Sequence, residues 1–165
     1  MDYFFKKFRE EHRIIRDLLL DLITAFLERD MPKAGKLLSE LNAISGPHFR
    51  YEEEALYPSL VQIFGEPYIN KLMTDHDLAI TRAKKLKTII EKGKNTKEDY
   101  LEGLNHIRAI LPHVSDCEGL TIMVEKLPEP KVNFIIQTMD SAIAENIPLL
   151  EWAGKGRGRK ALRIN

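Results

Sequence analysis

Four histidines occur at positions where a helical sequence usually places apolar residues. His12, His48 and His76 each continue a series of apolar residues spaced three and four apart, and His113 lies on a fourth predicted helix. A single inward histidine is readily explained by a hydrogen bond to a backbone carbonyl. Four buried imidazoles without partners would cost roughly 1 to 3 kcal/mol each. A metal site shared by facing helices would satisfy all four, and bundle interiors are where such sites form.

A carboxylate accompanies the second of these histidines. Glu52 follows His48 by four residues, and because that spacing turns a helix by about 40° beyond one full turn, both side chains face the same way. Glu53 and Glu54 turn away by about 100° each, so we expect them on a solvated face. Imidazole and carboxylate ligands suit iron, zinc and manganese, and their combination inside a helical bundle points first to iron.

Long amphipathic helices would position these residues. Apolar residues recur at spacings of three and four through most of the chain, and no strand-like alternation of useful length occurs. The predicted helices run from the N-terminus to about residue 28, from 31 to Pro58 or Gly65, from 66 to 92, from 96 to 127 and from 130 to 147. We expect a kink or a restart at Gly46-Pro47 and a perturbation at Pro112, because proline removes an internal hydrogen bond.

The order of these helices predicts an all-α fold. Four long helices joined by short loops are typical of an antiparallel up-down-up-down four-helix bundle, here with an additional C-terminal helix. We expect residues 1–127 to form the bundle. Residues 128–153 would form the extra helix, which packs on the bundle or at a homodimer contact, and residues 154–165 a basic, disordered tail.

The ordered set of ligand types resembles a known family. His12, then His48-Phe-x-x-Glu52, then His76, then His113-x-x-x-x-Glu118, is similar to the hemerythrin-like (HHE cation-binding) family over roughly residues 1–127. The resemblance implies a four-helix bundle with a non-haem di-iron centre, where O2 binds at an open iron position. It also implies that His12 and His48 hold one metal, His76 and His113 the other, and that Glu52 and Glu118 bridge them.

The third and fourth helices depart from the family pattern. The third usually supplies two histidines four residues apart, but Leu72 and Ile80 stand at those distances from His76, so one imidazole is missing. On the fourth helix the bridging residue is a glutamate where O2-carrying members have an aspartate. Together with the missing imidazole, this argues against reversible O2 carriage and leaves room for redox chemistry, another metal or weak binding.

The spacing on the fourth helix leaves the ligand open. Five residues turn a helix by about 140°, which aims Glu118 away from His113. Cys117 and Asp116 are therefore alternative ligands. His106 lies seven residues before His113, about 10 Å along the axis, so we expect it on the surface or supporting the site.

Composition excludes several classes of protein. The 165 residues are 44% apolar and 30% charged, with no apolar run near the roughly 18 to 20 residues that span a bilayer. One cysteine and an N-terminus unlike a signal peptide predict a cytoplasmic protein. The 25 basic and 25 acidic residues balance, yet the last twelve residues hold five basic residues and no acidic one. We expect no nucleic-acid partner except through this tail.

These observations favour a cytoplasmic hemerythrin-like metal-binding protein with a di-iron centre, although zinc or manganese would also fit the ligands. Its role would be sensing or handling of O2, NO or redox state, or iron handling, as a binding protein rather than an enzyme. One alternative is a di-iron oxidase or an enzyme that repairs damaged clusters. Another is a bundle whose metal site has decayed and which acts as an interaction module.

Overall fold

The computed structural model describes residues 2–157, and within this range every regular element is a helix. The elements are α1 (Asp2–Glu28), α2 (Met31–Tyr51), the π-helix η1 (Glu52–Leu56), α3 (Tyr57–Phe64), α4 (Glu66–Glu91), α5 (Lys97–Arg108), α6 (Leu111–Glu118), α7 (Thr121–Val124), α8 (Glu129–Glu145) and α9 (Leu149–Gly154). The predicted all-α class is confirmed. None of the described helices combines the length and the apolar character needed to cross a membrane.

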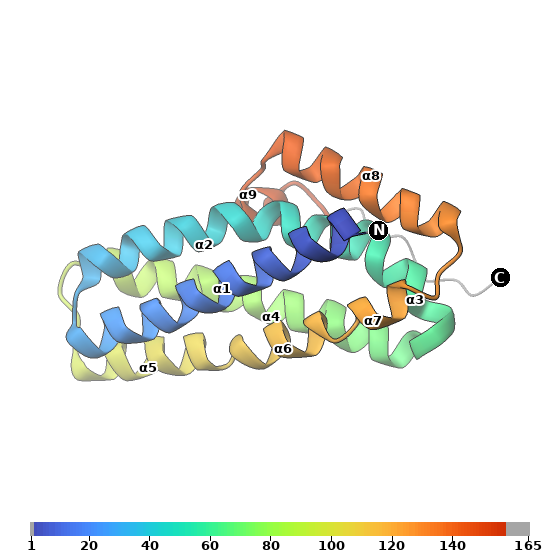
Figure 1. The fold of residues 1–165 in the computed structure, drawn as a ribbon. Coiled ribbons are helices and arrows are strands. Elements are labelled where there is room, and N and C mark those ends of the chain that lie inside the picture. Colours follow the sequence, from blue (N-terminus) through green and yellow to red (C-terminus); the bar gives the residue numbers. More distant parts are fainter. Residues whose placement is uncertain (1, 158–165) are drawn as a thin grey trace.

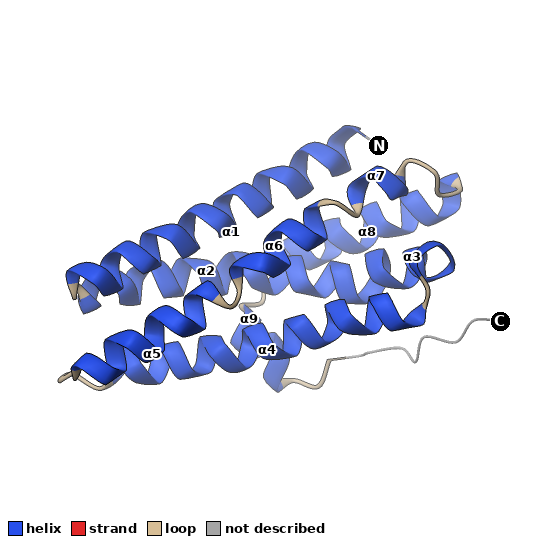
Figure 2. Cartoon of the chain, turned by 90° about the horizontal axis from the view of Figure 1, so that it is seen from below, coloured by secondary structure: helices blue, strands red, loops and turns tan. Residues whose placement is uncertain are grey.

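The long helices enclose one interior. α1 and α4 each pack against both α2 and α5, and α6 and α7 continue the direction of α5 (Figure 1, Figure 2). The apolar faces that defined the predicted helices are buried between them, as Leu22, Phe26, Leu86 and Ile107 illustrate. Removal of these side chains from water is the main force that holds the helices together.

The buried apolar residues form two clusters, one on each side of a polar layer. On α1, Phe8 belongs to one cluster and Ile15 to the other, and His12 lies between them. On α4, His76 lies between residues of the two clusters in the same way. The polar layer therefore has apolar packing on both sides.

The second helical stretch has its irregularity later than predicted, and it ends at one of the two predicted residues. α2 continues through Pro47 without a restart, and the irregularity comes later, as the π-helix η1 at Glu52–Leu56. Gly46 allows a close approach instead, because a Cβ atom there would lie 2.0 Å from the carbonyl oxygen of Ile147. The helical stretch ends at Gly65, whose φ of 79° suits glycine best.

The fourth helical stretch is broken where the sequence predicts a perturbation. α5 ends at Arg108 and α6 begins at Leu111, with Pro112 in its first turn. Proline fits the first turn because the backbone N–H that it lacks would have no helical acceptor there. The break gives His113 and Cys117 a short helix of their own.

The C-terminal region forms two helices rather than one. α8 packs along α2 and η1, and α9 packs against α2 and α4 (Figure 1). Asn146, in the left-handed conformation, and Pro148 separate the two helices. Most of the predicted basic tail, residues 158–165, lies outside the described residues.

Candidate metal centre

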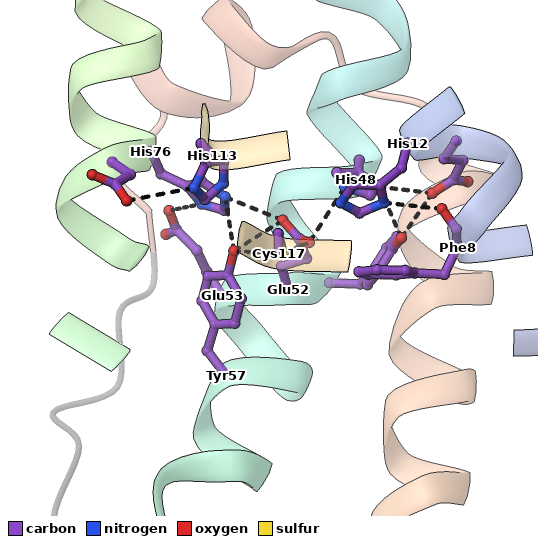
Figure 3. A network of polar contacts seen from close by, with 12 residues as sticks. Phe8, His12, His48, Glu52, Glu53, Tyr57, His76, His113 and Cys117 are labelled. Atoms are coloured by element: carbon purple, nitrogen blue, oxygen red, sulfur yellow. Dashed lines mark hydrogen bonds and ion pairs between the residues drawn. The ribbon is translucent and has the colours of Figure 1, made fainter. Parts of the chain in front are cut away.

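Six side chains with metal-ligating atoms meet in the polar layer of the bundle (Figure 3). All six are buried. We call them the polar cluster: His12, His48, Glu52, His76, His113 and Cys117. Figure 3 shows Glu52 and Cys117 between two histidine pairs, which we call the first pair, His12 and His48, and the second pair, His76 and His113.

Glu52 connects the two halves of the cluster. Its Oε1 lies 3.3 Å from Nε2 of His48 and accepts a hydrogen bond of 2.7 Å from the Cys117 thiol. Its Oε2 lies 3.1 Å from Nε2 of His76 and accepts a hydrogen bond of 3.3 Å from the Tyr57 hydroxyl. Each carboxylate oxygen thus faces a different histidine, as a bridging ligand requires.

The first pair is held from within α1 and α2. Nδ1 of His48 lies 2.8 Å from Oε2 of Glu11, and the Tyr51 hydroxyl donates to the same oxygen at 2.7 Å. Nδ1 of His12 donates to the carbonyl oxygen of Phe8, one helical turn earlier, at 3.0 Å. Because Nδ1 of each ring has a hydrogen-bond partner, Nε2 is the ring nitrogen left to bind an ion.

The second pair depends on the irregular helix η1. Nδ1 of His76 lies 2.9 Å from Oε1 of Glu53. The expectation that Glu53 lies on a solvated face is wrong, because its side chain is only 2% exposed. In η1 the backbone bonds span five residues rather than four, and the changed turn carries Glu53 inward beside Glu52.

His113 is the least constrained histidine of the cluster. Its Nδ1 has no hydrogen-bond partner among the described residues, and the closest carboxylate oxygen, Oδ2 of Asp75, is 3.7 Å away. It also borders a cavity of about 90 Å³ that Asp75, Lys71 and Asp116 help to line. A buried nitrogen without a partner is costly, and its ring can supply Nε2 or Nδ1 to an ion.

Ion pairs set the charges of the cluster. Burial alone lowers the pKa of His48, but Glu52 and Glu11 outweigh it and raise the pKa to about 10. Burial likewise opposes protonation of His76, yet Glu52 and Glu53 raise its pKa. Burial would raise the pKa of Glu52, but His48 and His76 hold it well below its usual range. At neutral pH the ionised Glu52 carboxylate therefore lies between the imidazolium group of His48 and the His76 ring, whose pKa is raised.

The remaining members of the cluster are uncharged at neutral pH. Burial lowers the pKa of His12 to about 4, and the charge on His48 adds to this effect. Burial and the charge on His76 lower the pKa of His113 to about 4. Burial and the neighbouring Glu52 raise the pKa of the Cys117 thiol well above its usual value. Each pair therefore combines a histidine whose pKa is lowered with one whose pKa is raised.

Two groups of side chains have the geometry to hold an ion. Ligand atoms of His12, Glu52 and Cys117 lie within 4.8 Å of one another, and so do those of Glu52, His76 and His113. Both groups contain Glu52. Imidazole, carboxylate and thiol are ligands that iron and zinc accept, and the unpartnered nitrogen of His113 adds a donor with no other role. The residues fit a metal.

A comparison of the sequence with models of known families also indicates a cation-binding domain. The model of the hemerythrin HHE cation-binding domain matches residues 4–120, more than half of the chain. The chain belongs to the hemerythrin HHE cation-binding family. No curated protein and no solved structure gives a significant match. The matched residues of this HHE chain include the whole polar cluster and exclude α8 and α9.

One of the six ligands predicted from the sequence does not join the cluster of this HHE protein. Glu118 is exposed, and Cys117 takes the inward position. The reason is the helical angle: in α6, four residues bring a side chain back to the face of His113, whereas five do not. Asp116 pairs with Lys71 at 2.9 Å on the surface. His106 pairs with Glu102, also away from the cluster.

Sequence reasoning missed the carboxylates that orient the histidines. Glu11 precedes His12 by one residue, so its orientation toward α2 and His48 depends on how the two helices pack. Glu53 turns inward only because η1 changes the helical period. The sequence feature that could have revealed Glu53 is the run of three glutamates beginning at Glu52. Three consecutive side chains cover a wide arc of a helix, so such a run includes side chains that face the interior in any helical geometry.

Proposed function

We propose that this HHE protein binds a dinuclear metal centre, most simply di-iron, through the six residues of the polar cluster. The observation that carries the proposal is the position of Glu52, whose two oxygens face His48 and His76 separately. A bridging carboxylate needs this arrangement. Metal ions would take the place of any protons on the histidine nitrogens that face Glu52.

The ligands divide into two sets that share Glu52. His12, His48 and Cys117 would hold one metal, and His76 and His113 the other. The thiol of Cys117 favours iron or zinc over manganese at the first position, because manganese prefers oxygen ligands. The second position has fewer protein ligands and lies near the cavity at His113, which favours it as the position that small molecules reach.

The role that suits such a site is sensing or handling of O2, NO or redox state, or iron handling, in the cytoplasm. A bound iron centre supplies changes of oxidation state and coordination positions for small molecules. The chain itself binds the metals, orients their ligands and excludes water through the apolar clusters on both sides. We regard the protein as a binding or sensing protein rather than an enzyme.

The remaining proposals concern assembly. We propose residues 1–127 as the bundle in the antiparallel up-down-up-down order, which the packing of α1 and α4 against both α2 and α5 supports. A homodimer contact through the C-terminal helices is a further proposal. Sedimentation at several protein concentrations tests it, since a dimer would dissociate on dilution.

Metal analysis tests the proposed centre directly. After anaerobic reconstitution with ferrous iron, we expect two metals per chain and an absorption spectrum that changes on exposure to O2 or NO. His106→Ala is the matched control, because His106 is the histidine outside the cluster, and it should bind as much metal as the natural protein. Fewer than one metal per chain in the natural protein would refute the proposal.

A further inference from the structure

A cation from the C-terminal segment reaches the polar cluster. Nη2 of Arg157 lies 3.2 Å from Oε1 of Glu53, and the same oxygen is 2.9 Å from Nδ1 of His76. His76 in turn faces Glu52 through Nε2. A continuous series of charge-assisted contacts therefore runs from Arg157 to the carboxylate that the two histidine pairs share.

Several contacts fix the segment that carries Arg157. The backbone N–H of Leu150 donates to Oδ1 of Asn42 on α2 at 2.9 Å. Trp152 is buried, and the Arg157 guanidinium lies 5.5 Å from the centre of its ring. Arg157 also donates to the carboxylate of Asp77 on α4. The guanidinium is thus held by Trp152 of α9 and Asp77 of α4, within ion-pair distance of Glu53.

In the first pair, too, a cation contacts the carboxylate that orients a histidine, but the contact is weaker. Lys7 lies 3.8 Å from Oε1 of Glu11, the carboxylate that orients His48, and its side chain is 37% exposed. The Arg157 side chain is only 12% exposed and its contact with Glu53 is shorter. A guanidinium keeps its charge at any accessible pH, and a less solvated contact is screened less by salt. Arg157 should therefore act more strongly on Glu53 than Lys7 acts on Glu11.

We propose that Arg157 is a positioning residue for the second metal. Its guanidinium holds the Glu53 carboxylate directed at Nδ1 of His76, so that Nε2 of His76 is the nitrogen presented to the metal. Docking of the segment 149–157 then controls how tightly the second position holds its ion. This inference rests on the proposed metal centre, and it assigns a role to a residue outside the matched family domain.

The test compares Arg157→Gln and Arg157→Lys with the control Lys155→Ala. Lys155 belongs to the same segment but pairs with the exposed Glu151. In a chelator challenge of the reconstituted protein, we expect Arg157→Gln to release one of two metals about 10-fold faster or more, as is typical when a partner of a ligating histidine is lost. Arg157→Lys should restore part of the difference, and Lys155→Ala should match the natural protein.

A second measurement needs no metal. In the metal-free protein, the Nδ1 proton of His76 should give a slowly exchanging, downfield NMR signal that weakens or shifts in Arg157→Gln, while the His48 signal is unchanged. Equal release rates and equal His76 signals in the natural protein and Arg157→Gln would overturn the inference. So would faster release of both metals in proportion to a general loss of folding stability. A natural protein without metal but with the expected NMR difference would refute the metal centre alone.

Discussion

The two histidine pairs of the polar cluster have the same chemistry but different support. Each combines one imidazole whose pKa is lowered to about 4 with one whose pKa is raised and which faces Glu52. The first pair is oriented by regular turns of α1 and α2. In the second, His76 contacts Glu53 of the π-helix, which also pairs with Arg157, and His113 has an unpartnered nitrogen.

This difference indicates that the two proposed metal positions would have different roles. The first pair is built by two long helices whose packing also forms the core, so its geometry follows from folding. The second pair borders the cavity at His113 and relies on elements that can change without unfolding the bundle. We therefore expect the first position to retain its metal and the second to exchange metal and admit small molecules.

Glu52→Gln should have the largest effect, because it removes the group that both halves share. His48 and His76 would each lose one of the two buried carboxylates that face them, and loss of one partner of a buried ion pair costs about 3 to 5 kcal/mol. We expect metal binding to disappear at both positions and the metal-free protein to unfold at lower denaturant. Retention of one metal per chain, measured by elemental analysis, would mean that the halves are independent.

His48→Ala and His113→Ala should lower the stability of the metal-free protein by different amounts, one for each half of the cluster. Replacing His48 leaves the buried carboxylates of Glu11 and Glu52 without their shared counter-charge, a loss of about 3 kcal/mol. Replacing His113 removes a neutral ring with an unpartnered nitrogen, which should cost about 1 kcal/mol. Urea unfolding measures both, and equal losses would contradict the difference in support.

The pH dependence of metal affinity should differ between the positions. At the first, metal displaces protons from His48 and Cys117, whose pKa values are raised. At the second it displaces a proton from His76 alone. Raised pKa values mean that protons compete with the metal, so affinity at the first position should rise by about 100-fold per pH unit between about 6 and 9, and affinity at the second should rise less steeply.

Competition titrations with a chelator at several pH values measure both slopes. His12 and His113, with pKa values of about 4, are already neutral in this range and should contribute nothing. Equal slopes at the two positions would show that the Cys117 thiol is not a ligand.

Of the four predicted effects, that of Cys117→Ser should be the smallest. The hydroxyl preserves the hydrogen bond to Glu52 but replaces a soft ligand by a hard one. We expect zinc affinity at the first position to fall about 10-fold, which is within the range for one altered contact, and manganese affinity to change little. Cobalt loading supplies the readout, since a thiolate band in the near ultraviolet should be present in the natural protein and absent from the variant.

Much of the site followed from helical periodicity alone. The histidines of α1, α2 and α4 were predicted to face inward because they continue apolar faces, and Glu52 because it lies four residues after His48. These are local statements about one helix at a time. The directions of Cys117 and Glu118 are of the same kind: in the regular geometry of α6 the residue on the face of His113, Cys117, is buried and Glu118 is exposed.

The sequence by itself determined the helices, their buried faces and the types of ligand that those faces carry. Only the tertiary structure decided which groups orient those ligands. Glu11 reaches His48 across a helix interface, Glu53 reaches His76 through a π-helix, and Arg157 reaches Glu53 from more than a hundred residues along the chain. The physical reason is that a helix defines side-chain directions over a few residues, whereas contacts between distant segments depend on how the whole chain packs.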